Sequence, residues 1–216
     1  MTSPHPLLNG IYYHIYNRGV NRENIFIEER NYEYFLLLLT KHIEPVAELF
    51  AYCLLRNHFH LMVRVKTEEE IKGSITRSRS PTGTIAVPES NEVPGENYAS
   101  NKFSNFFNAY AKGFNLAYGR TGSLFQHPFG RVMVTTDWQF WNVIAYIHQN
   151  PQKHHFVDDF RDWKYSSYGL ILADKPSFLQ RDTVLDWFGG REQYLARSAE
   201  WVTDAQSNWF AADDLE

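Results

Sequence analysis

Residues 57–66 carry apolar and polar side chains in alternation. Side chains point in turn to the two faces of a β-strand, so this pattern predicts a strand with one apolar and one polar face. Two histidines then stand side by side on the polar face, with Cα atoms about 6.5–7 Å apart. The apolar face carries Phe59, Leu61, Val63 and Val65, and the polar face carries His58, His60, Met62, Arg64 and Lys66.

The two histidines allow two interpretations. Two imidazoles this close on one surface can share a divalent metal ion, which needs at least one more ligand from elsewhere. They can also be ordinary polar residues on the solvated face of an antiparallel strand. In both cases we expect this face to be solvent-exposed. Replacing His58 or His60 with alanine should then cost little stability.

Composition limits the class of protein. A chain of 216 residues fits one domain, or one domain with a long insertion. The single cysteine, Cys53, excludes a disulfide framework and a cysteine-based zinc site. A net charge of −4 argues against indiscriminate nucleic-acid binding but allows a local basic groove. No apolar run approaches the length of a membrane span, and the first nine residues lack signal-peptide features, so we expect a cytoplasmic protein without a membrane partner.

The order of predicted elements indicates an α+β fold. It reads strand, helix, strand, strand, helix, strand, which is the ferredoxin-like split βαβ plan, an antiparallel sheet with its helices on one face. The residues at 56–57 form the tight turn of a β-hairpin. The predicted strands are 11–18, 48–55, 57–66 and 124–136, and the predicted helices are 29–42 and 100–118.

A third helix is predicted from residue 138 to about residue 149, with Asp137 as its N-cap and Pro151 closing it. One face is apolar. On the other, Tyr146 and Asn150 are four residues apart and therefore point the same way. If this helix lies over the open face of the sheet, its polar stripe meets the histidines.

Two segments lie outside this plan. Residues 67–99 are rich in Ser, Thr, Pro, Gly and Glu, so we expect a flexible insertion, with a short helical turn at Ile71, inside a domain of residues 1–168. Residues 169–216 are expected to form a helical extension that packs on this domain. Its clearest helix is predicted at 191–201.

Five motifs carry a family resemblance. Residues 55–63 resemble the histidine-hydrophobic-histidine motif of single-tyrosine transposases, and residues 146–151 resemble the catalytic tyrosine helix of their REP-associated branch. Residues 13–19, 122–125 and 163–168 are also similar to motifs of this branch, and all five occur in the family's order. The resemblance covers about residues 11–168.

The resemblance implies a transposase that cleaves and joins single-stranded DNA at hairpins. It implies that Tyr146 is the nucleophile that forms a 5′-phosphotyrosine. It also implies a Mg²⁺ or Mn²⁺ ion held by His58, His60 and Asn150, and we expect His14 to support this site from the neighbouring strand. Relatives include monomers and homodimers, so both states remain open.

Candidate phosphate contacts are Arg18, Arg22, Arg131 and Lys153. The two arginines around Gly19 fit an ordinary solvated turn as well. Two other functions stay open: a non-catalytic protein of this fold that binds DNA hairpins, and a metal-dependent phosphodiesterase in which water attacks instead of Tyr146.

Overall fold

The computed structural model describes residues 6–77, 97–203 and 206. Its centre is a four-stranded antiparallel sheet in the order β2-β3-β1-β4. This order places β3 between β1 and β2, which are joined through a helix, as the split βαβ plan requires. The strands are β1 (Tyr12–Arg18), β2 (Ala47–Leu54), β3 (His58–Val65) and β4 (Gly130–Val134). The predicted α+β class is therefore confirmed.

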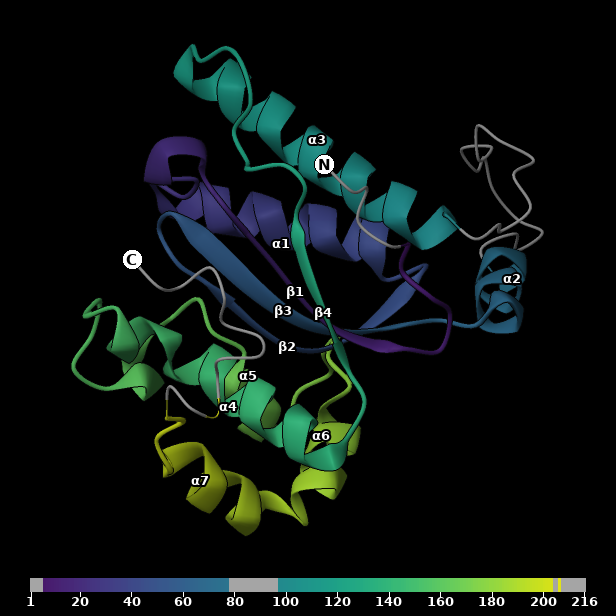
Figure 1. The fold of residues 1–216 in the computed structure, drawn as a ribbon, viewed down its shortest axis with the longest axis vertical. Helices are drawn as coiled ribbons and strands as arrows, with labels where there is room; N and C mark the ends of the chain where they lie inside the picture. Colours follow the sequence, from purple (N-terminus) through teal and green to yellow (C-terminus); the bar gives the residue numbers. More distant parts are fainter. Residues whose placement is uncertain (1–5, 78–96, 204–205, 207–216) are drawn as a thin grey trace.

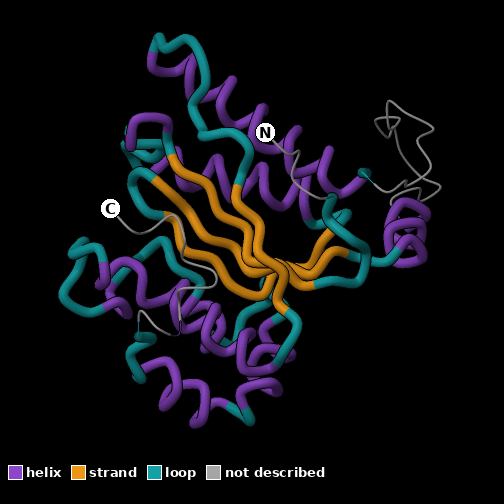
Figure 2. Tube along the Cα trace, viewed as in Figure 1, coloured by secondary structure: helices purple, strands orange, loops and turns teal. Residues whose placement is uncertain are grey.

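Helices cover both faces of the sheet (Figures 1 and 2). On one face lie α1 (Glu29–Ile43) and α3 (Tyr98–Tyr118). On the other lies α4 (Asp137–Lys153), with the smaller helices around it. These are α5 (Tyr168–Leu172), α6 (Arg181–Phe188) and α7 (Arg191–Ala199), and two 3₁₀ helices, η1 (Val20–Arg22) and η2 (Phe160–Asp162), lie in connections. None of the described helices is long and apolar enough to cross a membrane.

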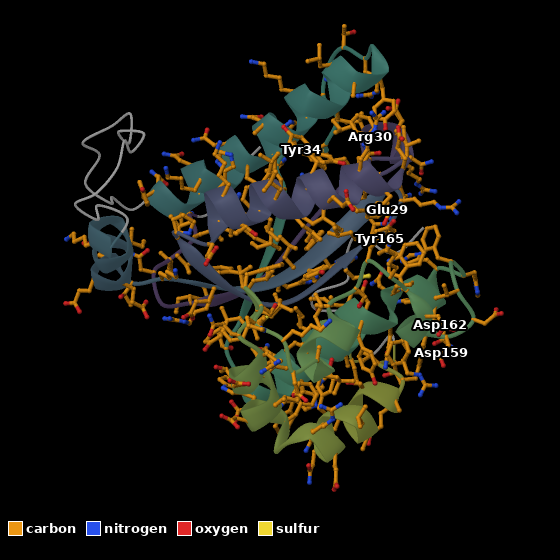
Figure 3. The ribbon with its side chains drawn as sticks, turned by 180° about the vertical axis from the view of Figure 1, so that it is seen from behind. Glu29, Arg30, Tyr34, Asp159, Asp162 and Tyr165 are labelled. Carbon is orange, nitrogen blue, oxygen red and sulfur yellow. The ribbon has the colours of Figure 1, made fainter. Side chains whose placement is uncertain are left out.

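Aromatic side chains fill the layer between the sheet and the first pair of helices. Phe35 of α1 contacts Phe59 of β3 and Phe106 of α3, with ring centroids 4.9 and 4.8 Å apart. The two helices come close because α3 carries Gly113, where a Cβ atom would lie 2.7 Å from the ring of Tyr34. The aromatic residues of α3 that are buried in this layer, Phe103, Phe106, Phe107, Tyr110 and Phe114, are therefore core. Figure 3 shows Tyr34 in this layer, on the side of the sheet away from α4.

The helix α4 differs from its prediction at both ends. Its N-cap is Thr136, because the hydroxyl of Thr136 accepts from the backbone of Gln139 and the Gln139 side chain accepts from the backbone of Thr136. The helix also continues past Pro151 to Lys153. Proline in the last turn removes one backbone hydrogen bond, and the turn still closes through His154 N–H donating to the carbonyl of Asn150 at 3.0 Å.

Residues 67–99 contain more structure than a short turn. The helix α2 (Glu68–Arg77) follows β3 directly, and Ile71 in its first half is buried. Residues 78–96 of the expected insertion lie outside the described residues. The C-terminal extension adds α6, which the sequence did not predict, and α7 ends at Ala199 instead of residue 201.

The connection between α4 and the extension ties the two helical layers together. Tyr165 stacks on Tyr32 of α1 with a centroid distance of 3.5 Å, and Lys164 forms an ion pair with Glu29. Figure 3 shows Glu29 and Tyr165 beside each other at this junction. The edge of β2 is covered here, because Leu54 N–H donates to the carbonyl of Tyr165 at 3.0 Å.

Candidate functional site

The histidine strand has the predicted alternation. Phe59 packs toward α1 and α3, while His58 and His60 lie on the opposite face, under α4. The expectation that this face is solvent-exposed is wrong. His58 is 4% exposed and His60 is 2% exposed, because α4 packs directly on β2 and β3. The prediction that replacing His58 or His60 costs little stability assumed an exposed face, so its premise is wrong as well.

His60 is held by a third histidine. His14 lies on β1, and its Nε2 is 3.0 Å from Nδ1 of His60, with the two rings stacked. Both side chains are buried. Burial, followed by the nearby charges of His14 and His58, holds the pKa of His60 well below its usual value. His60 is therefore neutral near pH 7, and the contact with His14 engages its Nδ1.

His58 lies between two amide oxygens. Its Nδ1 is 2.7 Å from Oδ1 of Asn57, and its Nε2 is 3.1 Å from Oδ1 of Asn150 on α4. Burial, followed by the charge of His154, lowers the pKa of His58 to about 3, so it is neutral near pH 7. A neutral imidazole carries one N–H and can donate to only one of the two oxygens. The other ring nitrogen then presents its lone pair to an amide oxygen.

Tyr146 lies over the same histidines. Its ring meets His60 edge-on at a centroid distance of 5.6 Å and His14 at 6.2 Å. The ammonium of Lys153, two turns further along α4, is 5.1 Å from the centre of the Tyr146 ring. Tyr146 is 2% exposed. The four-residue spacing of Tyr146 and Asn150 thus brings both side chains to the histidine face of the sheet, as the sequence predicted.

The four basic candidates separate into two groups. Arg18 is paired in register with His58 on the same face of the sheet, and its charge acts on His58, His60 and His154. Lys153 lies beside Tyr146. The structure therefore brings these two to the site.

The other two candidates lie elsewhere. Arg131 is paired with Ile15, so it points to the opposite face, where its guanidinium lies 3.9 Å from the centre of the Phe129 ring. Arg22 is exposed in η1, after the end of β1.

A shallow hollow opens beside the histidine pair. It lies at the end of β1, between β3 and the loop that leads into β4. Gly130 permits this shape, because a Cβ atom there would lie 2.2 Å from the ring of Tyr16. The hollow is lined by Tyr16, Asn17, Arg18, His58, His60, Gln126, Pro128 and Gly130.

The sequence prediction missed His154. It is the C-cap of α4, four residues after Asn150, and its ring lies edge-on to His58 at 5.0 Å. Burial, then the charges of Lys153 and Arg18, lowers the pKa of His154 to about 4. Its Nε2 is buried and has no hydrogen-bond partner among the described residues. The spacing from Asn150 was a usable signal, which the predicted end of the helix at Pro151 concealed.

The site offers two imidazoles and one amide oxygen, which are ligand types that divalent ions accept. No group of three His, Cys, Asp or Glu side chains in the described part of the chain is arranged to hold a metal, so an ion here depends on the Asn150 amide oxygen. The 3.1 Å between His58 Nε2 and Asn150 Oδ1 matches the separation of about 3 Å between neighbouring ligands of an octahedral ion. The residues present therefore fit Mg²⁺ or Mn²⁺.

Comparison with solved structures gives a fold relative. The chain is similar to a REP-associated tyrosine transposase bound to a REP hairpin, with a TM-score of 0.55 and 17% sequence identity, over 82% of this chain and 88% of the other. The two chains share a fold. No protein-family model matches the sequence, and no curated protein matches it. At 17% sequence identity, the similarity shows a shared arrangement of strands and helices and no more.

Proposed function

We propose that this protein is a metal-dependent endonuclease and strand transferase that acts on single-stranded DNA at hairpins, as a transposase does. The observation that carries the proposal is the convergence of Tyr146, Asn150 and the His58–His60 pair on one face of the sheet, from two elements far apart in sequence. The fold relative, a transposase bound to a DNA hairpin, supports the choice of substrate.

His58, His60 and Asn150 would hold the metal ion. Both imidazoles are neutral, as metal ligation requires, and because their Nδ1 atoms contact His14 and Asn57, Nε2 would be the ligating atom of each ring. When bound, a divalent ion supplies Lewis-acid polarisation of the scissile phosphate. Asn57 and His14 would be supports of the ligands.

Tyr146 would carry out the covalent step. Its phenolic oxygen bonds to phosphorus, and the bond from phosphorus to the 3′ oxygen breaks. The phenol loses its proton and the leaving 3′ oxygen gains one, so the step releases a 3′-OH and leaves a 5′-phosphotyrosine. Because the phosphotyrosine keeps the phosphodiester bond energy, a second 3′-OH can reverse the step and join strands.

Two basic side chains would supply positive charge at the site, although the chain as a whole carries a negative net charge. An unperturbed phenol has a pKa of about 10, so the attack needs positive charge that favours the phenolate. The ammonium of Lys153 beside the Tyr146 ring supplies it. Arg18, in the hollow next to His58, is placed to contact a phosphate group. With a net charge of −4, DNA binding then depends on these few contacts and on hairpin shape.

The test is incubation of the protein with labelled hairpin DNA and Mn²⁺, followed by a denaturing gel. Tyr146→Phe keeps the ring and removes only the nucleophilic oxygen, so cleavage and the covalent adduct should fall by at least about a hundredfold while DNA binding remains. Tyr34→Phe is the matched control, because Tyr34 lies in the helical layer on the other face of the sheet.

Each alternative function gives a different gel. Cleavage without an adduct, unchanged in Tyr146→Phe, would assign the attack to water and make the protein a phosphodiesterase. Hairpin binding without cleavage in any metal would make it a non-catalytic binding protein. Either result would exclude the transposase mechanism.

A further inference from the structure

Three consecutive residues of α4 are polar and buried. His148, Gln149 and Asn150 are each 3% exposed or less, in a helix whose residues from Val143 to Pro151 are all buried. A buried polar side chain costs free energy unless it is hydrogen-bonded, so three in a row are costly without partners. Consecutive helix residues point about 100° apart, so these three side chains face three different directions.

Each direction meets a different part of the chain. Asn150 faces the sheet, where its Oδ1 contacts His58. His148 faces the connection after α4 and the helix α7. Its Nε2 is 2.8 Å from the hydroxyl of Ser167, which accepts from the backbone of Tyr52, and its Nδ1 is 3.3 Å from the hydroxyl of Tyr194.

Gln149 faces the end of the C-terminal extension. Its amide group donates to the carbonyls of Ser198 at 3.1 Å and Glu200 at 2.6 Å, and its Oε1 accepts from the backbone N–H of Val202 at 3.0 Å. One side chain thus binds three backbone groups. We call residues 198–202 the C-terminal bracket.

These bonds restrict rotation and sliding of α4, which apolar packing alone would permit. Hydrophobic contact is non-directional, so a helix packed by apolar groups alone can rotate or slide slightly at small cost. Hydrogen bonds are directional, so a buried hydrogen-bond network restricts the arrangement more than apolar contact does. Bonds in three directions within one turn fix both the rotation of α4 and its position along its axis.

We propose that His148 and Gln149 are positioning residues, and that the C-terminal bracket holds α4 in the setting that places Asn150 on His58 and Tyr146 on His60. The inference rests on the proposed function and deepens it, because it makes the extension part of the catalytic unit. Neither residue touches the reacting groups. Their effect passes through the orientation of α4.

The main test variant is Gln149→Met, which keeps the length of the side chain and removes all three hydrogen bonds. Gln152→Met is the matched control, since Gln152 is in the same helix and its side chain makes one described hydrogen bond, which its Oε1 accepts from Phe160 N–H at 3.2 Å. Tyr194→Phe is a milder variant that keeps the ring and removes only the hydroxyl at His148. It also keeps the test valid if Gln149→Met does not fold.

Three readouts apply to the full-length protein. Amide hydrogen exchange of α4 should become at least about tenfold faster in Gln149→Met, with α1 unchanged. Mn²⁺ affinity by calorimetry should fall about tenfold, as expected when support of a ligand is lost. The single-turnover cleavage rate should fall about ten- to a hundredfold, with the hairpin Kd within about threefold of the unaltered protein.

The outcomes separate this inference from the proposed function. If the unaltered protein cleaves DNA and Gln149→Met and Tyr194→Phe behave like Gln152→Met in all three readouts, the positioning role is wrong. If the unaltered protein does not cleave but Gln149→Met shows faster α4 exchange and weaker Mn²⁺ binding, the bracket stands and the transposase function fails. If it neither cleaves nor binds Mn²⁺, unchanged α4 exchange would overturn the bracket.

Discussion

His60 shows how burial changes the expected cost of a substitution. Its contact with His14 and its place under α4 mean that His60→Ala removes a hydrogen bond and leaves a cavity. We expect a loss of roughly 2 kcal/mol or more in the free energy of unfolding, together with loss of Mn²⁺ binding. Urea denaturation of the metal-free protein measures the first. His127→Ala, at an exposed histidine in the loop before β4, should stay within about 0.5 kcal/mol.

The buried histidine His148 predicts loss of stability in acid. Burial lowers its pKa to about 3 in the folded chain, against 6.5 as the ordinary value. As pH falls below 6.5, His148 binds a proton in the unfolded chain but stays neutral in the folded chain. The free energy of unfolding therefore falls by up to about 1.4 kcal/mol per pH unit between about pH 6 and pH 4 from this residue alone, and is unaffected above pH 7.

The contribution of His148 can be isolated by comparing unfolding curves. His148→Gln removes the titrating group, so its stability should decline less steeply between pH 6 and pH 4 than that of the unaltered protein. Gln152→Met leaves every histidine in place, so it should keep the original slope. Equal slopes for the His148 variant and the unaltered protein would mean that His148 is protonated in the fold.

For single residues, the sequence predicted on which face of a strand or helix a side chain lies, but not whether that side chain is buried. Alternation and four-residue spacing placed His58, His60, Tyr146 and Asn150 on the correct sides of their elements, because these rules depend only on local geometry. Whether a face is solvated depends on what packs against it, which local patterns do not contain. The candidate Arg131 lies on the other face of the sheet for a related reason. Pro128 and Gly130 interrupt the alternation, so the sequence did not define the register of β4, and the register decides the face of Arg131.

The helix α4 shows the same limit at the level of an element. Its polar residues indicated an amphipathic helix with one apolar face and one polar stripe that meets the histidines. In the fold every residue from Val143 to Pro151 is buried, since the sheet lies on one side of the helix and the C-terminal extension on the other. The polar residues are there to meet specific partners. Short helices such as α6 carry too little periodic signal to be predicted from sequence, so only the helix at 191–201 was predicted in the extension.

The helix α2 depends on one arginine. Arg64 at the end of β3 binds Glu48 at 2.7 Å, and it makes a forked contact with Glu70 in the first turn of α2, at 2.7 and 3.3 Å. We expect Arg64→Met to increase amide exchange in α2 with a global cost of about 1 kcal/mol or less, because Glu70 is half-exposed. Hydrogen exchange with mass spectrometry measures the first effect. Lys72→Met, on the exposed side of α2, is the control, and equal exchange in both variants would show that Ile71 alone holds the helix.

For the molecule as a whole, the sheet acts as a partition. Its α1–α3 side is an aromatic core, and its α4 side carries the candidate chemistry. The element order was sufficient to predict this partition, because the split βαβ plan puts both early helices on one face and leaves the other open. It could not predict how firmly the second layer is attached, since that depends on side-chain hydrogen bonds between distant segments.

The attachment of α4 predicts that one chain completes the site. Tyr146 lies on the histidines of its own chain, and α4 is bonded to its own extension through His148 and Gln149. Exchange of α4 without its extension would break these bonds and uncover residues that are buried from Val143 to Pro151. A mixture of Tyr146→Phe and His60→Ala proteins should therefore cleave hairpin DNA no faster than the two variants assayed apart.

The mixing experiment needs one control, and one outcome would contradict the prediction. Each variant mixed with the unaltered protein should leave the unaltered protein's activity intact, which shows that neither variant is an inhibitor. Cleavage restored to a quarter or more of the unaltered rate would mean that a tyrosine from one copy serves the histidines of another. In that case either α4 and the C-terminal bracket cross to the other copy together, or their hydrogen bonds form between chains.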